Sequence, residues 1–265
     1  MWIDIILPLA ILGILGAFFG CLLGFSSKQF AVEEDPLTEE LRAALPGANC
    51  GGCGFVGCDD YAKAVAEGKA APNLCVVGGA DANREMSRIL GIESSEMARM
   101  IAHVACLGDC ENASKRVDYY GACDCEQLML LPGGGDKACA YGCLGMGTCT
   151  KVCKFDAISV VNGVAVVDEK KCTGCGACAA VCPKHLIHLV PASSFVRVSC
   201  VNPKRGKDVS SVCKVGCIGC GLCAKNCPQM IIEMKDNLPQ IDYELCIACG
   251  LCAEKCPRHI IKKAE

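Results

Sequence analysis

Two cysteine runs near the C-terminal end constrain this chain more than any other feature. Each run has the spacing C-x2-C-x2-C-x3-C and is followed by proline, at residues 217–228 and 246–257. In such runs three cysteines hold one iron–sulfur cube and the fourth crosses to the other cube. A structural zinc site fits poorly, because it uses two cysteine pairs separated by a longer gap. The spacing predicts two [4Fe–4S] clusters, one held by Cys217, Cys220, Cys223 and Cys256 and the other by Cys227, Cys246, Cys249 and Cys252.

Cysteine usage also indicates the redox environment. Cysteine makes up 27 of the 265 residues, in spacings typical of metal ligands rather than of a disulfide framework. Thiolates that ligate iron must stay reduced, so we expect the bulk of the chain to lie in a reducing compartment. Only 5% of the residues are aromatic, and we expect the clusters themselves to hold much of the fold together.

The formal net charge of −3 conceals an uneven distribution. Residues 1–136 carry 9 Lys and Arg against 19 Asp and Glu, net −10, whereas residues 137–265 carry 17 against 10, net +7. A cube with four thiolates adds a charge of about −2, which nearby lysines would offset. Little basic surface would then remain for nucleic acid, and we predict no nucleic-acid partner.

The N-terminal stretch is apolar over residues 3–25, with Asp4 as the only charge. A helix of this length spans roughly 34 Å, enough for the hydrocarbon core of a bilayer. A cleaved signal peptide would need a basic start and a shorter apolar stretch. The sequence predicts an uncleaved transmembrane anchor, with the region after Lys28 on the cytoplasmic side. A linker follows, and Asp35-Pro36 is a good start for a short helix.

A second type of cluster motif follows this helix. It has the spacing C-x2-C-x4-C-x16-C, and its glycines let backbone N–H groups approach the sulfurs. The motif resembles the small four-iron domain shared by the B subunit of the Rnf complex and some corrinoid proteins. We assign one [4Fe–4S] cluster to Cys50, Cys53, Cys58 and Cys75.

Residues 81–104 have apolar side chains at helical spacing, from Met86 to Val104, and are predicted to be helical. His103 lies in this stretch with no other histidine nearby. We therefore expect a packed or surface histidine rather than a ligand.

The middle of the chain departs from the regular cysteine run. Cys143, Cys149 and Cys153 fall at the first, third and fourth ligand positions, but Met146 stands at the second. Because a thioether is a poor cluster ligand, another thiolate must substitute, and Cys139 is the predicted one.

The partner run of this middle region is regular. It is followed by Pro183 and comprises Cys172, Cys175, Cys178 and Cys182. Lys154 replaces the proline of the irregular run. Between the two runs, Asn162-Gly163 separates β-branched segments and predicts a hairpin.

These assignments place 20 cysteines in five clusters. Of the seven that remain, Cys21 is interpreted as a small apolar residue, and Cys123 is unassigned. A sixth cluster is a hypothesis, against the alternative of buried free thiols. Its candidate ligands are Cys106, Cys110, Cys125, Cys200 and Cys213.

The predicted fold class is α+β, with an N-terminal transmembrane helix, a small helical four-iron domain and two tandem ferredoxin-like 2[4Fe–4S] modules. The expected boundaries are 1–28 for the anchor, 29–45 for the linker and short helix, 46–105 for the four-iron domain, 106–136 for an irregular cysteine-containing connector, 137–198 for the first module and 199–265 for the second.

The order of these segments resembles the B subunit of the Rnf ion-translocating ferredoxin:NAD oxidoreductase complex. The resemblance implies an electron-transfer subunit in the cell membrane that accepts electrons from soluble reduced ferredoxin. It passes them to membrane and peripheral partner subunits, which couple the transfer to Na+ or H+ movement. No nucleotide-binding glycine loop or flavin motif is found in the sequence, so NAD chemistry is expected in another subunit.

Two alternatives remain at this point: a polyferredoxin subunit of another membrane oxidoreductase such as a hydrogenase, and an anchored iron–sulfur sensor. The basic residues of the C-terminal half suggest where an acidic ferredoxin would dock. The candidate docking residues are Lys204, Arg205, Lys262 and Lys263, against the alternative that they only offset cluster charge.

Overall fold

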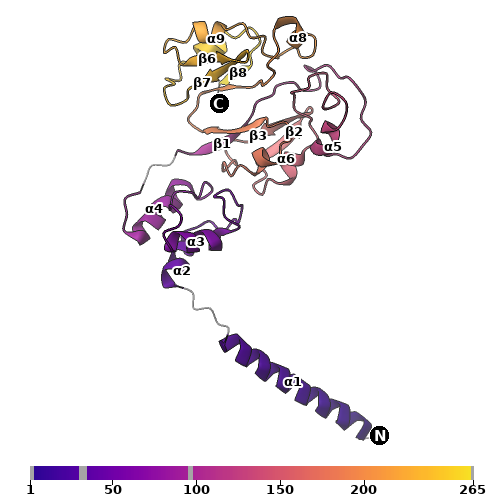
Figure 1. Cartoon of the computed structure of the whole chain (residues 1–265), viewed down its shortest axis with the longest axis vertical. Helices are drawn as coiled ribbons and strands as arrows, with labels where there is room; N and C mark the ends of the chain where they lie inside the picture. The colour runs from indigo at the N-terminus through magenta and orange to yellow at the C-terminus, as the bar shows by residue number, and fades with distance from the viewer. Residues whose placement is uncertain (1–2, 30–34, 95–97, 264–265) are drawn as a thin grey trace.

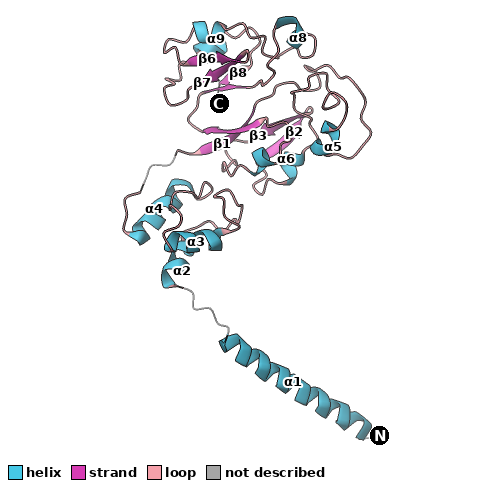
Figure 2. Cartoon of the chain, in the orientation of Figure 1, coloured by secondary structure: helices cyan, strands magenta, loops and turns pink. Residues whose placement is uncertain are grey.

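The computed structural model describes residues 3–29, 35–94 and 98–263. Its helices are α1 (Ile3–Gln29), α2 (Pro36–Ala43), α3 (Cys58–Ala66), α4 (Gly79–Leu90), α5 (Cys125–Met129), α6 (Thr148–Lys151), α7 (Ala177–Ala180), α8 (Gly206–Ser210), α9 (Leu222–Lys225) and α10 (Leu251–Glu254). Its strands are β1 (Met100–Val104), β2 (Ile158–Val161), β3 (Val164–Val167), β4 (Ile187–Pro191), β5 (Val196–Val198), β6 (Ile232–Lys235), β7 (Leu238–Ile241) and β8 (Ile261–Lys263). The α+β class is confirmed (Figure 2).

The N-terminal helix requires a correction. No helix in the described part of the chain is long and apolar enough to cross a membrane. The predictions of a transmembrane anchor and of a single-pass membrane location with a cytoplasmic cluster region are therefore wrong.

Helices α2, α3 and α4 form a small domain around Leu41, Tyr61 and Met86, each at most 1% exposed. Helix α2 begins as predicted, because the Asp35 carboxylate accepts a hydrogen bond from the backbone N–H of Leu37 and proline follows the cap. Residues 30–34 of the predicted linker, including Glu33 and Glu34, lie outside the described residues.

The predicted helix over residues 81–104 is correct only in its first half. Helix α4 ends at Leu90 because Gly91 adopts the left-handed conformation that terminates many helices. Residues 100–104 form the strand β1, which pairs antiparallel with β4. Met97 lies outside the described residues.

Two ferredoxin-like modules follow, each built from two two-stranded antiparallel sheets. The first pairs β1 with β4 and β2 with β3, and the second pairs β5 with β8 and β6 with β7. The predicted hairpin is confirmed: Asn162 and Gly163 both have positive φ, as a type I′ turn requires. Each module has its own core, and buried cysteines make up part of both.

The modules lie side by side, with the C-terminal end of the chain between them and the α2–α4 domain on the far side of the first module (Figure 1). Between β1 and the first ligand run, the first module carries an insertion at residues 105–142 with one short helix, α5. The buried ammonium of Lys137 holds the insertion in place, because Nζ donates to the carbonyl oxygens of Gly108 and Gly163, at 2.7 Å each.

Candidate iron–sulfur centres

The cysteines of the α2–α4 domain gather around its core. The Asn49 side chain accepts a hydrogen bond from the backbone N–H of Cys58 at 2.8 Å and so holds the start of α3. The sulfur of Cys75 accepts the backbone N–H of Gly78 at 3.3 Å. Burial raises the pKa of the Cys75 thiol, and the neighbouring thiols Cys58, Cys53 and Cys50 also raise it. All four predicted ligands therefore lie near one another.

In the second module the two predicted ligand sets are also brought together. Burial raises the pKa of the Cys252 thiol to about 11, and Cys246 and Cys249 are nearby thiols that raise it. A pocket is lined by Cys227, Cys246, Cys249 and Cys252. The pKa of Cys217 is likewise raised to about 11, by burial first and then by nearby thiols including Cys223 and Cys256.

In the regular half of the first module, four cysteines are also brought together. One pocket is lined by Cys153, Cys172, Cys175 and Cys178. Backbone N–H groups point at their sulfurs: Ala157 donates to Cys153 at 3.4 Å, and Ala102 donates to Cys172 at 3.3 Å. Such N–H···S contacts stabilise negative charge on a reduced cluster.

The irregular half differs from the prediction made for Cys139. A pocket in this half is lined by Cys125, Cys143, Cys149 and Cys182, and Cys139 does not line it. Met146 packs against the small apolar cluster that contains Cys125. Burial raises the pKa of the Cys149 thiol to about 12, and Cys143 and Cys125 are the neighbouring thiols that raise it most. The structure thus places Cys125 where the missing second ligand is needed.

The position of Cys125 has a local explanation. It opens α5, where the Asp124 carboxylate caps the helix by accepting the backbone N–H groups of Glu126 and Gln127. The backbone N–H of Cys125 itself donates to the Thr148 hydroxyl at 2.8 Å, and Thr148 adjoins the ligand Cys149. The insertion is therefore attached to the irregular ligand run at the point where that run lacks a cysteine.

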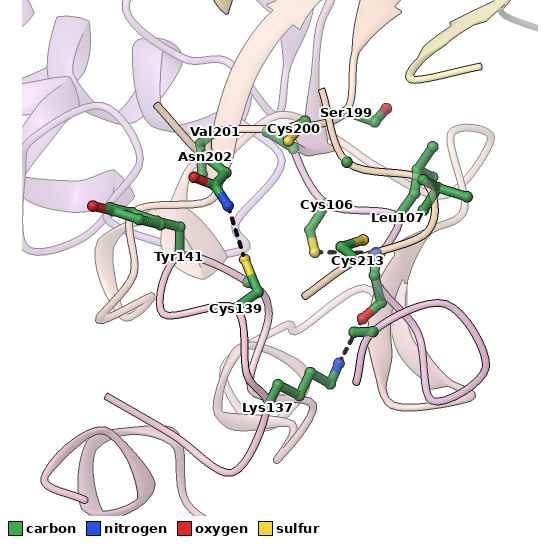
Figure 3. Close-up of a pocket in the computed structure, with 16 residues that line it drawn as sticks. Cys106, Leu107, Lys137, Cys139, Tyr141, Ser199, Cys200, Val201, Asn202 and Cys213 are labelled. Atoms are coloured by element: carbon green, nitrogen blue, oxygen red, sulfur yellow. Dashed lines mark hydrogen bonds between the residues drawn. The ribbon is translucent and has the colours of Figure 1, made fainter. Parts of the chain in front are cut away.

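Cys139 belongs to a different group, which lies between the modules. One pocket is lined by Cys106, Cys139, Cys200 and Cys213 (Figure 3). The Asn202 side-chain amide donates to the Cys139 sulfur at 3.6 Å. Burial raises the pKa of the Cys106 thiol to about 11, and it also raises the pKa values of Cys200 and Cys213.

Two hydrogen bonds connect this group to the neighbouring ligand runs. The sulfur of Cys106 accepts the backbone N–H of Cys143 at 3.3 Å, and the sulfur of Cys200 accepts that of Cys217 at 3.4 Å. Cys143 opens the runs of the first module and Cys217 opens those of the second. The four-thiol group therefore lies between one ligand run of each module.

The residues present fit iron–sulfur cubes, because several pockets are each lined by four cysteines. A cube spreads its four thiolate ligands over four separate iron corners. Cysteine binds metal as the thiolate, so metal binding displaces the thiol proton.

Of the other candidates, Cys110 and Cys123 are exposed and line none of the pockets described above. Cys21 is exposed on α1. His103 is packed as expected, with Nε2 3.0 Å from the carbonyl oxygen of Val198.

Known families match the three cluster-bearing parts. The FeS family, an Fe-S cluster family, matches residues 45–77. A 4Fe-4S binding domain matches residues 165–188, and a 4Fe-4S dicluster domain matches residues 216–260.

Relatives match along nearly the whole chain. The B subunit of the Na(+)-translocating ferredoxin:NAD(+) oxidoreductase complex of Acetobacterium woodii is 46% identical over 91% of this chain and 72% of its own length. The B subunit of the proton-translocating ferredoxin:NAD(+) oxidoreductase complex of Clostridium ljungdahlii is 43% identical over 91% and 85%. The B subunit of the ion-translocating oxidoreductase complex of Methanosarcina acetivorans is 40% identical over 89% of both.

The chain belongs to the family of Rnf-complex B subunits. It is an iron–sulfur electron-transfer subunit with 4Fe-4S ferredoxin domains. The resemblance seen in the sequence is confirmed.

Proposed function

We propose that this subunit carries six [4Fe–4S] clusters and relays electrons from reduced ferredoxin to other subunits of an ion-translocating ferredoxin:NAD oxidoreductase complex. The observation that carries the proposal is the group of four thiols between the two modules, hydrogen-bonded to a ligand run on each side. A cluster held by these four thiols would lie between the two clusters of one module and the two clusters of the other, and would join them into one continuous series. The parts of the proposal that concern ferredoxin, NAD(+) and ion movement are inferred from the names of the relatives.

The proposed ligand sets follow the groups of cysteines described above. In chain order they are Cys50, Cys53, Cys58 and Cys75; Cys106, Cys139, Cys200 and Cys213; Cys125, Cys143, Cys149 and Cys182; Cys153, Cys172, Cys175 and Cys178; Cys217, Cys220, Cys223 and Cys256; and Cys227, Cys246, Cys249 and Cys252. A bound [4Fe–4S] cluster supplies one-electron redox chemistry, and the backbone donors around the sulfurs adjust its potential. NAD(+) chemistry is assigned to another subunit.

Electrons enter this series through the second module, where basic residues lie directly on the ligand loops. The side chain of Arg205 lies 3.5 Å from where a Cβ on Gly219 would stand, and that of Lys263 lies 2.9 Å from the same position on Gly250. Both glycines are inside ligand runs. Cys220 and Cys249 are exposed, so these clusters lie close to the surface that a donor would contact.

The ferredoxin route can be tested with anaerobically prepared protein. Six cubes contain about 24 iron atoms and as many sulfides per chain. Reversing the charge at Lys204, Arg205, Lys262 and Lys263 should slow reduction by ferredoxin about tenfold or more at low ionic strength, because opposite charges steer association. The difference should fade as salt is added.

Two controls accompany this experiment. Reduction by dithionite should be unchanged, and a charge reversal at Lys69, which pairs with Glu67 in the α2–α4 domain, should leave the ferredoxin rate intact. A wild-type rate for the fourfold variant at low salt would exclude this docking surface. An iron content near 20 would remove one cluster from the proposal.

A further inference from the structure

Lys154 is the one departure from the regular ligand run that the cluster assignments leave unexplained. The other three runs of the two modules end in Cys-Pro, at Pro183, Pro228 and Pro257, whereas Cys153 is followed by lysine. The turn itself is the same in all four places. The residue three positions after the fourth cysteine has positive φ each time, namely Asp156, His185, Met230 and His259.

The structure shows what the lysine contacts. Its ammonium group donates to the backbone carbonyl oxygen of Asn49 at 2.8 Å and approaches that of Ala48 at 3.4 Å. Both carbonyls immediately precede the ligand Cys50 in the α2–α4 domain. A side chain at the end of one ligand run therefore holds the start of a ligand run in another domain.

The same two domains meet again beside this bond. A Cβ built on Gly52 would stand 2.8 Å from the carbonyl oxygen of Cys175 and 3.3 Å from its Cβ. Gly52 lies between the ligands Cys50 and Cys53, so only a residue without a side chain allows this approach. One proposed ligand loop thus approaches another across the two domains.

We propose that Lys154 and Gly52 form the electron-transfer junction between the α2–α4 domain and the first module. The inference rests on the proposed ligand sets. One electron leaves the reduced cluster of the Cys153–Cys178 set, which is oxidised, and reduces the cluster of the Cys50–Cys75 set by one electron. The original donor is reduced ferredoxin. Lys154 is a positioning residue: it touches neither cluster but keeps the two ligand loops in contact, and tunnelling rates fall steeply with distance.

The attraction at this junction is local rather than a property of whole domains. Residues 35–94 carry 5 Lys and Arg against 9 Asp and Glu, net −4, whereas residues 98–191 carry 9 against 9 and are neutral. The Lys154 bond is exposed, so we expect the contact to be reversible and weakened by salt rather than permanently locked.

Three variants test the junction. Lys154→Pro restores the regular run and removes the bond, and Lys154→Met removes the bond without proline. Gly52→Ala keeps the lysine but places a methyl group against Cys175. Lys151→Met is the matched control, because Lys151 also donates to a backbone carbonyl, that of Cys123 at 2.8 Å, but within its own module.

Three measurements apply to each variant. Iron content tests the ligand sets and should stay at the wild-type value. Small-angle X-ray scattering should show a larger radius of gyration for the junction variants, because the α2–α4 domain is released. Freeze-quench electron paramagnetic resonance after reduction by ferredoxin should show the Cys50–Cys75 cluster reduced about fivefold more slowly in Lys154→Met, the effect of losing a bond of about 1 kcal/mol. Gly52→Ala should slow it further.

The outcomes distinguish failure of the junction from failure of the proposed ligand sets. Full iron with wild-type scattering and wild-type arrival of electrons in Lys154→Pro and Gly52→Ala would overturn the junction and leave the six-cluster proposal standing. A wild-type protein without a reducible cluster at Cys50–Cys75 would instead refute the ligand set. Equal slowing in Lys151→Met would also overturn the junction, because charge removal alone would then explain the effect.

Discussion

The two ferredoxin-like modules share one plan but differ in how strictly their ligands follow it. Both consist of two two-stranded sheets, and the same turn follows each fourth cysteine. All the proposed ligands of the second module lie in two regular runs. The first has methionine at one ligand position and a long insertion that contains Cys125. In the proposed ligand sets, Cys125 of the insertion takes the position that methionine occupies in the run, because the insertion is held beside that run.

The insertion of the first module performs a second task as well. It supplies Cys139 to the four-thiol group between the modules, together with Cys106 at its start. The regular module contributes Cys200 and Cys213, which lie outside its ligand runs. The insertion of one module and the two additional cysteines of the other therefore meet in one pocket, which is the proposed site of the sixth cluster.

The largest expected effect comes from removing that shared site. Cys139→Ser should lose about 4 of about 24 iron atoms and interrupt electron flow from the second module to the first. Anaerobic iron analysis with time-resolved reduction measures both. Cys139→Ser/Cys213→Ser should lose no more iron than the single variant, because both residues serve one cluster, and Cys123→Ser should lose none. A double variant that loses about 8 iron atoms would show that Cys139 belongs to another cluster.

A second pair of variants tests whether Cys125 is the substitute ligand of the irregular run. Cys125→Ser should also lose about 4 iron atoms. Adding Met146→Cys should restore them, because Met146 packs against the apolar cluster that contains Cys125 and a cysteine there completes the regular run. The irregular run of the first module would then have a cysteine at each of its four ligand positions, as both runs of the second module do. Iron and sulfide analysis of the three proteins decides the matter, and a Cys125→Ser variant with unchanged iron would contradict the assignment.

The smallest effect concerns a backbone position between the first two ligands of a run. Gly174 and Ala248 occupy it in the first and second module, and both have positive φ, 71° and 57°. Ala248→Gly should raise the free energy of unfolding by about 0.5–1 kcal/mol, because alanine is strained there. Gly174→Ala should lower it by more, since the new Cβ would stand 2.4 Å from the Met100 carbonyl oxygen.

Denaturant-induced loss of cluster absorbance, measured anaerobically for the four combinations of these two substitutions, tests this difference. Iron content serves as the control for complete loading. A stabilising Gly174→Ala change would show that the two positions are not equivalent.

Much of this organisation can be predicted from the sequence where ligands are close together along the chain. The regular runs, the Asn162-Gly163 hairpin and the start of α2 all depend on local spacing and local backbone preference. The strand β1 was missed because its apolar residues also fit a helical period, although Gly91 marks the end of α4. Its partner β4 lies more than 80 residues away, and a pairing of that range leaves no local signal.

The same limit applies to Cys139, which the sequence favours as the substitute ligand and the proposed ligand sets place in the group between the modules. Its closeness to Cys143 in sequence favoured it as the substitute ligand, yet the pairing of β1 with β4 brings Cys106 to the site that Cys139 shares. Cys125 is farther along the chain from Met146 and is placed by the Asp124 cap and the Thr148 hydroxyl. Separation in sequence was a poor guide because the insertion folds back on the ligand run.

The shared site also bears on how the protein can be made and divided. Cys106 and Cys213 lie on either side of all the ligand runs of the first module, so a growing chain completes that module while Cys106 and Cys139 still lack their two partners. In the proposed assignment, the cluster of these two thiols can form only once the second module has emerged. A protein cut between β4 and β5 would likewise retain half of a site. The two modules look like repeated units, but neither can be inherited, deleted or expressed alone without leaving unpaired thiols at its edge.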